Sequence, residues 1–429
     1  MAFALAAAVL RSIVKLLIVV FCGFYDSSIV PHQRNHVNHQ WVKPVANLPE
    51  PGYTEEKERG DFVIYLDYAA SSPPYPQAAE KQLQVMLDAY GNPGAVHGPG
   101  NQARRILQGS RRTIAKLLNV REQEVFFTSG GTEANNWAVH LGIPGKKHMV
   151  AAATEHKSVL ESLGEMERQG YRVSYVRPDQ MGRILPETVE QAITPDTGLI
   201  CVQAVNNETG VIQDVDGLAD LAKKRGIPYF CDAVQSFGHV RQNLNKAGIL
   251  SLSAHKIGGP RGIGCLVVRY PVFPNPMILG GGQEQGRRSG TENVPGAAGF
   301  ALAAELALAE PEENLRELRD TLERKLKEIA PSVVINGENA PRHPGILNCR
   351  FPSITGEEMA ARLDLKGVCV SPGAACGARN PQPSHVLLAM GQTEQQAKEA
   401  IRFSLGRLPT MDEINATAQA VAEILNSSI

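Results

Sequence analysis

The stretch Tyr229-Phe-Cys-Asp-Ala-Val-Gln235 is a short apolar run that ends in an acidic residue before a small-residue turn. Similar apolar runs recur from Phe62 onward, and the stretches between them carry apolar residues at helical spacing. Nearly continuous apolar strands that alternate with helices indicate a parallel sheet covered by helices on both faces. The predicted strands are 63–66, 124–128, 148–153, 172–176, 199–204, 229–232 and 264–268, and the clearest predicted helices between them are 103–118 and 157–169.

The pattern changes after Pro295. Two helical stretches, 296–308 and 312–329, lead to short strands near 346–351 and 368–370, with further helices between and after them. This order of elements is typical of a smaller α+β domain. We therefore expect an N-terminal extension or targeting segment at 1–60, a large α/β domain at 61–310 and a small C-terminal domain at 311–429.

The composition is that of an ordinary globular metabolic protein. The 429 residues carry a net charge of −1 and no basic stripe, so we expect no nucleic acid among the partners. The seven cysteines are an odd number without a CxxC pair, which favours a reducing compartment over a disulfide-stapled secreted protein. No metal site is expected.

Residues 1–25 are apolar, carry Arg11 and Lys15, and contain no acid. The apolar run from 12 to 25 is short for a membrane span, which needs about 20 apolar residues, and Lys15 interrupts it. The segment is either a targeting signal or a dispensable extension. We expect a cytoplasmic protein without a membrane partner, or an organellar one if residues 1–25 form a transit peptide.

The first candidate site is the Gly-rich turn Thr128-Ser-Gly-Gly-Thr-Glu133, between a predicted strand and a predicted helix. Such a turn offers free N–H groups and the positive end of a helix dipole to a phosphate. Gly131 allows close approach of the backbone, and Thr132 adds a hydroxyl donor. The alternative is an ordinary strand–helix turn.

The second candidate is Asp232, at the C-terminal end of a predicted strand, where open α/β sheets bind ligands. In a pyridoxal enzyme such a carboxylate keeps the ring nitrogen protonated, so that the ring withdraws electrons. The alternative is an aspartate that only caps the next helix.

The third candidate is the turn Ser251-Leu-Ser-Ala-His-Lys256, which leads into a glycine-rich segment. A lysine in such surroundings is a candidate for a Schiff base with pyridoxal 5′-phosphate, since the reaction needs the free amine. Ser253 and His255 are then placed to contact the phosphate. The alternative is an ordinary surface lysine.

The ordered motifs from about Tyr65 to the C-terminus resemble the cysteine desulfurase family, in the class V aminotransferase group of fold-type I pyridoxal enzymes. The resemblance implies a mostly parallel seven-stranded sheet covered by helices, a smaller α+β domain and a homodimer. The motifs are Tyr65-Leu-Asp-Tyr-Ala-Ala70, Gly91-Asn-Pro93, 128–135, Thr154-Glu-His-Lys157, Val205-Asn-Asn-Glu-Thr-Gly-Val211, 253–264, Gly280-Gly-Gly-Gln-Glu284, Arg288-Ser-Gly-Thr-Glu-Asn293 and Ile401-Arg-Phe-Ser-Leu-Gly-Arg407.

The resemblance also implies which positions hold the cofactor. His156 would stack on the pyridine ring and carry protons during the reaction, and Asp232 would pair with the ring nitrogen. Asn207 and Gln235 would contact the hydroxyl side of the ring. The residues that would hold the phosphate are Thr132, Ser253, His255 and Thr291 of the partner subunit.

Substrate and sulfur chemistry are assigned in the same way. Arg402 would bind the carboxylate of L-cysteine through two parallel hydrogen bonds, and Asn92 would help to position it. Cys376 lies among small residues in Val370-Ser-Pro-Gly-Ala-Ala-Cys-Gly-Ala378, where the family has its sulfur-accepting cysteine. The persulfide would then pass to a sulfur-acceptor or iron–sulfur scaffold protein.

Three alternatives remain. The chain could be a selenocysteine lyase, which shares this chemistry, or a class V aminotransferase that forms no persulfide. It could also be an inactive scaffold for cluster assembly. The presence of Cys376 argues against the aminotransferase, and the presence of Lys256, Asp232 and His156 argues against the scaffold.

Overall fold

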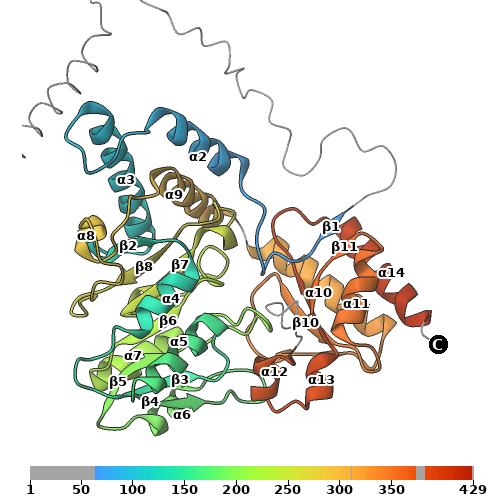
Figure 1. Ribbon diagram of the computed structural model, residues 1–429. Helices are drawn as coiled ribbons and strands as arrows, with labels where there is room; N and C mark the ends of the chain where they lie inside the picture. Colours follow the sequence, from blue (N-terminus) through green and yellow to red (C-terminus); the bar gives the residue numbers. More distant parts are fainter. Residues whose placement is uncertain (1–62, 311, 373–381, 428–429) are drawn as a thin grey trace, which may run out of the picture. The chain divides into compact units, whose positions relative to one another are not determined.

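The computed structural model describes residues 63–310, 312–372 and 382–427. A seven-stranded sheet forms its first half, with the strand order β2-β8-β7-β6-β5-β3-β4 (Figure 1). All neighbouring strands run parallel except β8, which runs antiparallel to both β2 and β7. The strands are β2 (Val125–Thr128), β3 (His148–Ala152), β4 (Arg172–Val176), β5 (Thr197–Cys201), β6 (Tyr229–Asp232), β7 (Ile249–Ser253) and β8 (Gly264–Val268).

The prediction of a mostly parallel seven-stranded sheet is confirmed, but one of its strands differs. The sequence places 63–66 among the strands, whereas β1 (Ile64–Tyr65) pairs in parallel with β11 (Val368–Cys369) in a separate two-stranded sheet. The seventh strand is β7, which the sequence analysis assigns in part to a turn. The serines at 251 and 253 interrupt the apolar run by which the other strands are predicted. Both side chains are nevertheless buried.

Successive residues of each strand point to opposite faces of the sheet, and both faces are apolar. Leu199 and Leu266 belong to one buried cluster, together with residues of α4 (Gly131–Val139) and α5 (Lys157–Arg168). Their neighbours Ile200 and Val267 belong to another cluster on the opposite face. This alternation explains why the strands read as continuous apolar runs.

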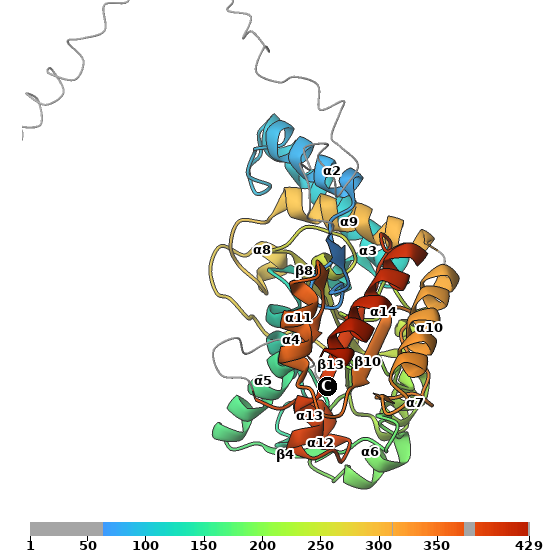
Figure 2. The same cartoon turned by 90° about the vertical axis from the view of Figure 1, so that its right-hand side faces the viewer.

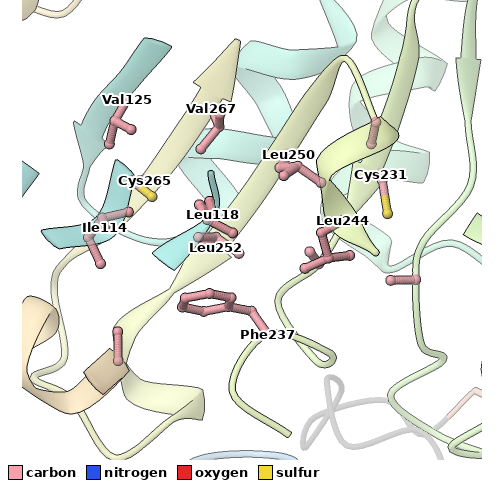
Figure 3. Packing of buried hydrophobic residues seen from close by; sticks show 14 of the residues in the cluster. Ile114, Leu118, Val125, Cys231, Phe237, Leu244, Leu250, Leu252, Cys265 and Val267 are labelled. Carbon is pink, nitrogen blue, oxygen red and sulfur yellow. The ribbon is translucent and has the colours of Figure 1, made fainter. Parts of the chain in front are cut away.

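The second face is covered by long helices that follow and precede the sheet in the sequence. In Figure 3, Leu250 and Leu252 of β7 lie near Ile114 and Leu118 of the segment that carries α3. The remaining elements of this half are α2 (Pro76–Asp88), α3 (Gly98–Leu117), η1 (Glu122–Glu124), α6 (Pro186–Ala192), α7 (Val215–Arg225), η2 (Leu244–Lys246), η3 (Ala254–Lys256), α8 (Gln283–Gly286) and α9 (Val294–Ala309).

Helix α3 begins five residues earlier than the predicted helix 103–118. His97 caps it, because its side chain accepts a hydrogen bond from the backbone N–H of Gly100, and Pro99 occupies the first turn. Proline is favoured there, since the first-turn N–H groups have no partner within the helix. The sequence Gly-Pro-Gly at 98–100 therefore does not look helical, although the cap at His97 specifies a helix start there.

The C-terminal half is an antiparallel sheet with the order β12-β13-β10-β9, packed under helices. Helices α10 and α14 lie side by side in Figures 1 and 2, and their apolar faces share a buried cluster with Leu347 and Phe403. The elements are α10 (Glu312–Ile329), β9 (Val334–Ile335), β10 (Ile346–Arg350), α11 (Gly356–Asp364), β12 (Ser371–Pro372), α12 (His385–Ala389), α13 (Glu394–Lys398), β13 (Ala400–Ser404) and α14 (Met411–Asn426).

Ile64 in β1 and Leu66 directly after it belong to this second cluster rather than to the cores of the large sheet. The division of the chain into 1–60, 61–310 and 311–429 stays a prediction. Within the part of the chain that the structure describes, no helix has the length and apolar character needed to cross a membrane.

A buried ion pair ties α3 to the turn at α8. Both terminal nitrogens of Arg111 donate to the carboxylate of Glu284 at 2.7 Å, and Glu284 also accepts from the N–H of Phe127 in β2. The two side chains are only 7 % and 3 % exposed. Removal of one charge therefore leaves the other buried without compensation.

We expect Glu284→Gln to lower the free energy of unfolding by roughly 3–5 kcal/mol, because Arg111 stays charged in a buried site. The matched control is Glu122→Gln, whose partner Arg112 is 59 % exposed, and that change should cost less than about 1 kcal/mol. Urea unfolding of both variants measures the difference. Equal losses would contradict the role given to the buried pair.

Candidate active site

Six strands of the large sheet end at the same edge, and five of them are followed by segments of the site. Strands β3, β5, β6 and β7 are parallel neighbours, and β2 runs in the same direction because β8 is antiparallel to both β2 and β7. Their carboxyl ends therefore meet, as in other open α/β sheets. The segments that follow them surround a cavity of about 220 Å³.

The cavity brings together nine of the predicted site residues, which come from five separate segments of the sequence. It also includes five residues that the sequence analysis did not single out. The predicted residues are Gly131, Thr132, His156, Asn207, Asp232, Gln235, Ser253, His255 and Lys256. The additional residues are Asn135, Ser158, Gln203, Val205 and Val234.

Arg402 is not among the lining residues, but it lies directly behind one of them. It comes from β13, donates from Nη1 to the carbonyl oxygen of Asn207 at 2.9 Å, and pairs through Nη2 with Asp67 at 2.8 Å. The side chain is only 3 % exposed, and its Nε has no hydrogen-bond partner among the described residues. A guanidinium is thus held at the back of the cavity.

Two other predicted residues, Asn92 and Thr291, do not line the cavity within the described chain. Asn92 is exposed, and its Oδ1 accepts a hydrogen bond from the N–H of Gly94. Thr291 is exposed as well. Cys376 lies outside the described residues.

Asp232 ends β6 and is followed by a turn rather than by a helix, so the alternative of a helix cap is wrong. Its Oδ1 accepts from the N–H of Val234 at 2.9 Å, which closes the turn after β6. Its Oδ2 accepts from Nδ2 of Asn135 at 2.7 Å. The carboxylate is 6 % exposed, so both hydrogen bonds stabilise a buried charge at the cavity.

The cavity can receive an anion beside Gly131. Gly131 is the first residue of α4, so the N–H groups of the first turn have no partner within the helix. A Cβ at Gly131 would lie 2.8 Å from a methyl carbon of Val234, which makes glycine necessary there. Thr132 and Ser253 add hydroxyl groups to the cavity lining.

His255 adds a ring nitrogen next to these hydroxyls. Burial lowers the pKa of His255 to about 4, and the positive charges of Lys256 and Arg261 act in the same direction. The imidazole is therefore neutral at pH 7. Its Nδ1 lies 3.3 Å from Oγ of Ser71.

Lys256 lies on the single turn η3, held from both sides. Its carbonyl oxygen accepts from Oγ of Ser72 at 2.6 Å and lies 2.9 Å from Nε2 of His239. Its Nζ donates to the carbonyl oxygens of Ala69 and Ala70 at 2.6 and 3.0 Å. The segment after β1 thus holds this lysine in place. This contact explains why the motif at 65–70 and the Lys256 turn occur in the same chain.

Glu155 is a fully buried acid beside the cavity. Its Oε1 accepts from the N–H of Gln203 at 2.7 Å, whereas its Oε2 has no partner among the described residues. Burial and, after it, the nearby negative charge of Asp232 raise the pKa of Glu155 to about 8. Glu155 is therefore protonated at pH 7, a state that no sequence motif indicates.

The comparisons with known proteins agree with this geometry. The family model "Aminotransferase class-V" matches residues 64–417. The cysteine desulfurase IscS of Dictyoglomus turgidum is 37 % identical over 372 residues, which cover 84 % of this chain and 94 % of the relative. The solved structure "NIFS-LIKE PROTEIN" has a TM-score of 0.79 and 34 % identity, and the match covers 85 % of this chain and all of that chain. A second structure, "SspA in complex with cysteine", has a TM-score of 0.72 and 33 % identity and is covered to 98 %, with 80 % of this chain matched.

The raised pKa of Glu155 predicts a pH-dependent stability. The folded state keeps the proton up to about pH 8, whereas the unfolded chain loses it near its ordinary value of 4.5. Stability from this group is therefore lost as the pH rises between these values. In Glu155→Gln this loss is removed, and we expect the variant to gain on the order of 2 kcal/mol relative to the native protein between about pH 5 and pH 8.

Thermal unfolding of native protein and variant at several pH values checks this expectation. The control is Glu161→Gln, an exposed acid on α5. If the native protein and Glu155→Gln lose stability in parallel as the pH rises, the buried carboxyl is not protonated in the folded state.

Proposed function

The chain belongs to the class-V aminotransferase family and, within it, to the cysteine desulfurases, and we propose that it transfers the sulfur of L-cysteine to Cys376 through chemistry that depends on pyridoxal 5′-phosphate. The observation that carries the proposal is the convergence of Lys256, Asp232 and His156 on one cavity. The similar structure with bound cysteine supports the substrate.

The residues present fit the cofactor. The helix N-terminus at Gly131, with Thr132 and Ser253, suits a phosphate. The buried carboxylate of Asp232 suits a protonated ring nitrogen. Oε1 of Gln235 is buried and has no partner among the described residues, so it can accept a hydrogen bond from a ring substituent. Asn207 shares this side, and Thr291 of a partner subunit in a homodimer would complete the phosphate site.

When bound, the cofactor withdraws the electrons that remain when a proton leaves the α-carbon of the substrate. Asp232 maintains this capacity by holding a proton on the ring nitrogen. Lys256 binds the cofactor in the resting enzyme and then, as a free amine, takes the α-proton at Nζ. Its position beside the carbonyl oxygens of Ala69 and Ala70 gives the amine a fixed place on that side of the cavity.

Arg402 is proposed to bind the substrate carboxylate, with help from Asn92. The buried guanidinium is already neutralised in part by Asp67, and its Nε is available for a further acceptor within the described structure. Charge-assisted bonds of this kind orient a substrate as well as hold it.

Cys376 is proposed as the nucleophile. Its thiolate attacks the sulfur of the substrate, a new sulfur–sulfur bond forms, and the carbon–sulfur bond breaks with its electrons moving to the substrate. After protons are returned to that carbon and to the α-carbon, L-alanine leaves and the persulfide remains on Cys376. The sulfur then passes to an acceptor protein, for iron–sulfur cluster assembly or another sulfur pathway.

The removal of Cys376 distinguishes the proposed function from two related ones, those of a selenocysteine lyase and of an aminotransferase. A selenocysteine lyase would release alanine faster from selenocysteine without this thiol, and an aminotransferase would not need it. We also propose a cytoplasmic location, supported by the free cysteines among the described residues, of which Cys201, Cys231, Cys265 and Cys349 are buried. An organelle is the alternative if residues 1–25 act as a transit peptide.

We expect Cys376→Ala to lower the rate of alanine formation from L-cysteine by about two orders of magnitude or more, because the covalent step is lost. Alanine and sulfide are measured with and without a thiol reductant, for L-cysteine and L-selenocysteine. The matched control, Cys369→Ala, removes a partly exposed thiol from β11 and should keep the native rate.

Two results would contradict the proposal. Unchanged conversion of L-cysteine by Cys376→Ala would favour the reaction without a persulfide. Faster alanine release from selenocysteine after removal of Cys376 would favour the selenocysteine lyase.

A further inference from the structure

Asp232 and His156 are joined by hydrogen bonds through two side chains to which the sequence analysis gave no role. Nδ2 of Asn135 lies 2.7 Å from Oδ2 of Asp232 and 2.8 Å from Oγ of Ser158. Oγ of Ser158 in turn lies 2.8 Å from Nδ1 of His156. All four residues line the same cavity.

The direction of these bonds follows from Asp232. An ionised carboxylate only accepts, so the part of the Asn135 amide that faces it must be the NH₂ group. The second proton of this group points to Ser158, whose oxygen accepts it. A rotated amide would set Oδ1 of Asn135 against the carboxylate in a buried site, which is costly. The hydroxyl proton of Ser158 is therefore directed to His156.

The backbone imposes the same condition on His156. This residue caps the N-terminus of α5, and its Nδ1 accepts from the N–H of Ser158 at 3.2 Å. A backbone N–H can only donate, so this 3.2 Å contact favours a lone pair on Nδ1 and acts together with the hydroxyl proton of Ser158. A neutral imidazole in this position therefore carries its proton on Nε2.

We propose that His156 works as a neutral imidazole with its proton on Nε2, and that Asn135 and Ser158 are positioning residues that fix this tautomer. The inference rests on the proposed function, in which His156 covers the cofactor ring. A neutral imidazole lies over a protonated ring without the repulsion of two positive charges. With Nδ1 occupied, His156 offers the cavity a hydrogen-bond donor rather than a base, and removal of the α-proton falls to Lys256.

The surroundings of His156 disfavour a second proton. Burial lowers the pKa of His156, and the positive charges of Lys256, His385 and Lys157 act in the same direction, while Asp232 opposes them. A proton on Nδ1 would also face the backbone N–H of Ser158, which can only donate. The imidazolium is therefore disfavoured by burial and by hydrogen bonding together.

The test is a two-bond proton–nitrogen correlation spectrum of the full chain labelled with ¹⁵N-histidine, recorded with and without pyridoxal 5′-phosphate. The His156→Gln variant assigns the signal among the 11 histidines. We expect the Nε2–H tautomer between about pH 6 and pH 8. An ordinary histidine, with a pKa of about 6.5, would be mostly charged at the lower end of this range. An imidazolium or an Nδ1–H tautomer at pH 7 in the native protein would overturn the proposal.

The double variant Asn135→Ala with Ser158→Ala tests the positioning role. Only the backbone N–H then faces Nδ1, so we expect signals of both tautomers and a pKa of His156 closer to 6.5. The control is Asn136→Ala, which removes a neighbouring amide of α4 that does not contact Asp232. A native tautomer and pKa in a folded double variant would remove the role given to Asn135 and Ser158.

The two proposals fail separately. The spectra need neither L-cysteine nor turnover, so a chain that does not desulfurate L-cysteine can still show the Nε2–H tautomer. Conversely, an active enzyme whose His156 is charged at pH 7 would keep the proposed function and lose this inference.

Discussion

A carboxylate at the end of a buried strand has to be surrounded by hydrogen-bond donors, and Asp232 meets this condition at the cavity. The N–H of Val234 satisfies one oxygen and Asn135 satisfies the other. Its charge raises the pKa of Glu155 and helps to keep that second acid protonated. The cavity thus contains one fixed negative charge, placed where a ring nitrogen of the proposed cofactor needs a partner.

The parallel arrangement of the sheet makes this local order possible. Because the carboxyl ends of β2, β3, β5, β6 and β7 meet at one edge, residues from distant segments surround the same volume. The segment after β1 then holds Lys256 from the other side, and β13 brings Arg402 behind Asn207. Contributions from both halves of the chain are therefore needed to complete the site.

Much of this could be predicted, for reasons that differ between residues. Strands buried on both faces are visible as apolar runs, and Asp232 and Lys256 stand out because polar residues end such runs. Strand β7 was missed because its buried serines imitate a turn. Asn135, Ser158 and Gln203 were missed because their roles depend on contacts across the sheet edge, which local sequence does not encode. The burial of Glu155 is likewise a tertiary property.

The central claim is that Lys256 is the lysine that binds the cofactor. Borohydride reduction of the protein loaded with pyridoxal 5′-phosphate, followed by mass mapping of its peptides, tests this claim most directly. We predict a single stable pyridoxyl group on the peptide that contains Lys256. A Lys256→Ala variant that is loaded and reduced in the same way should carry none. A label on another lysine of the native protein, or no label at all, would contradict the account.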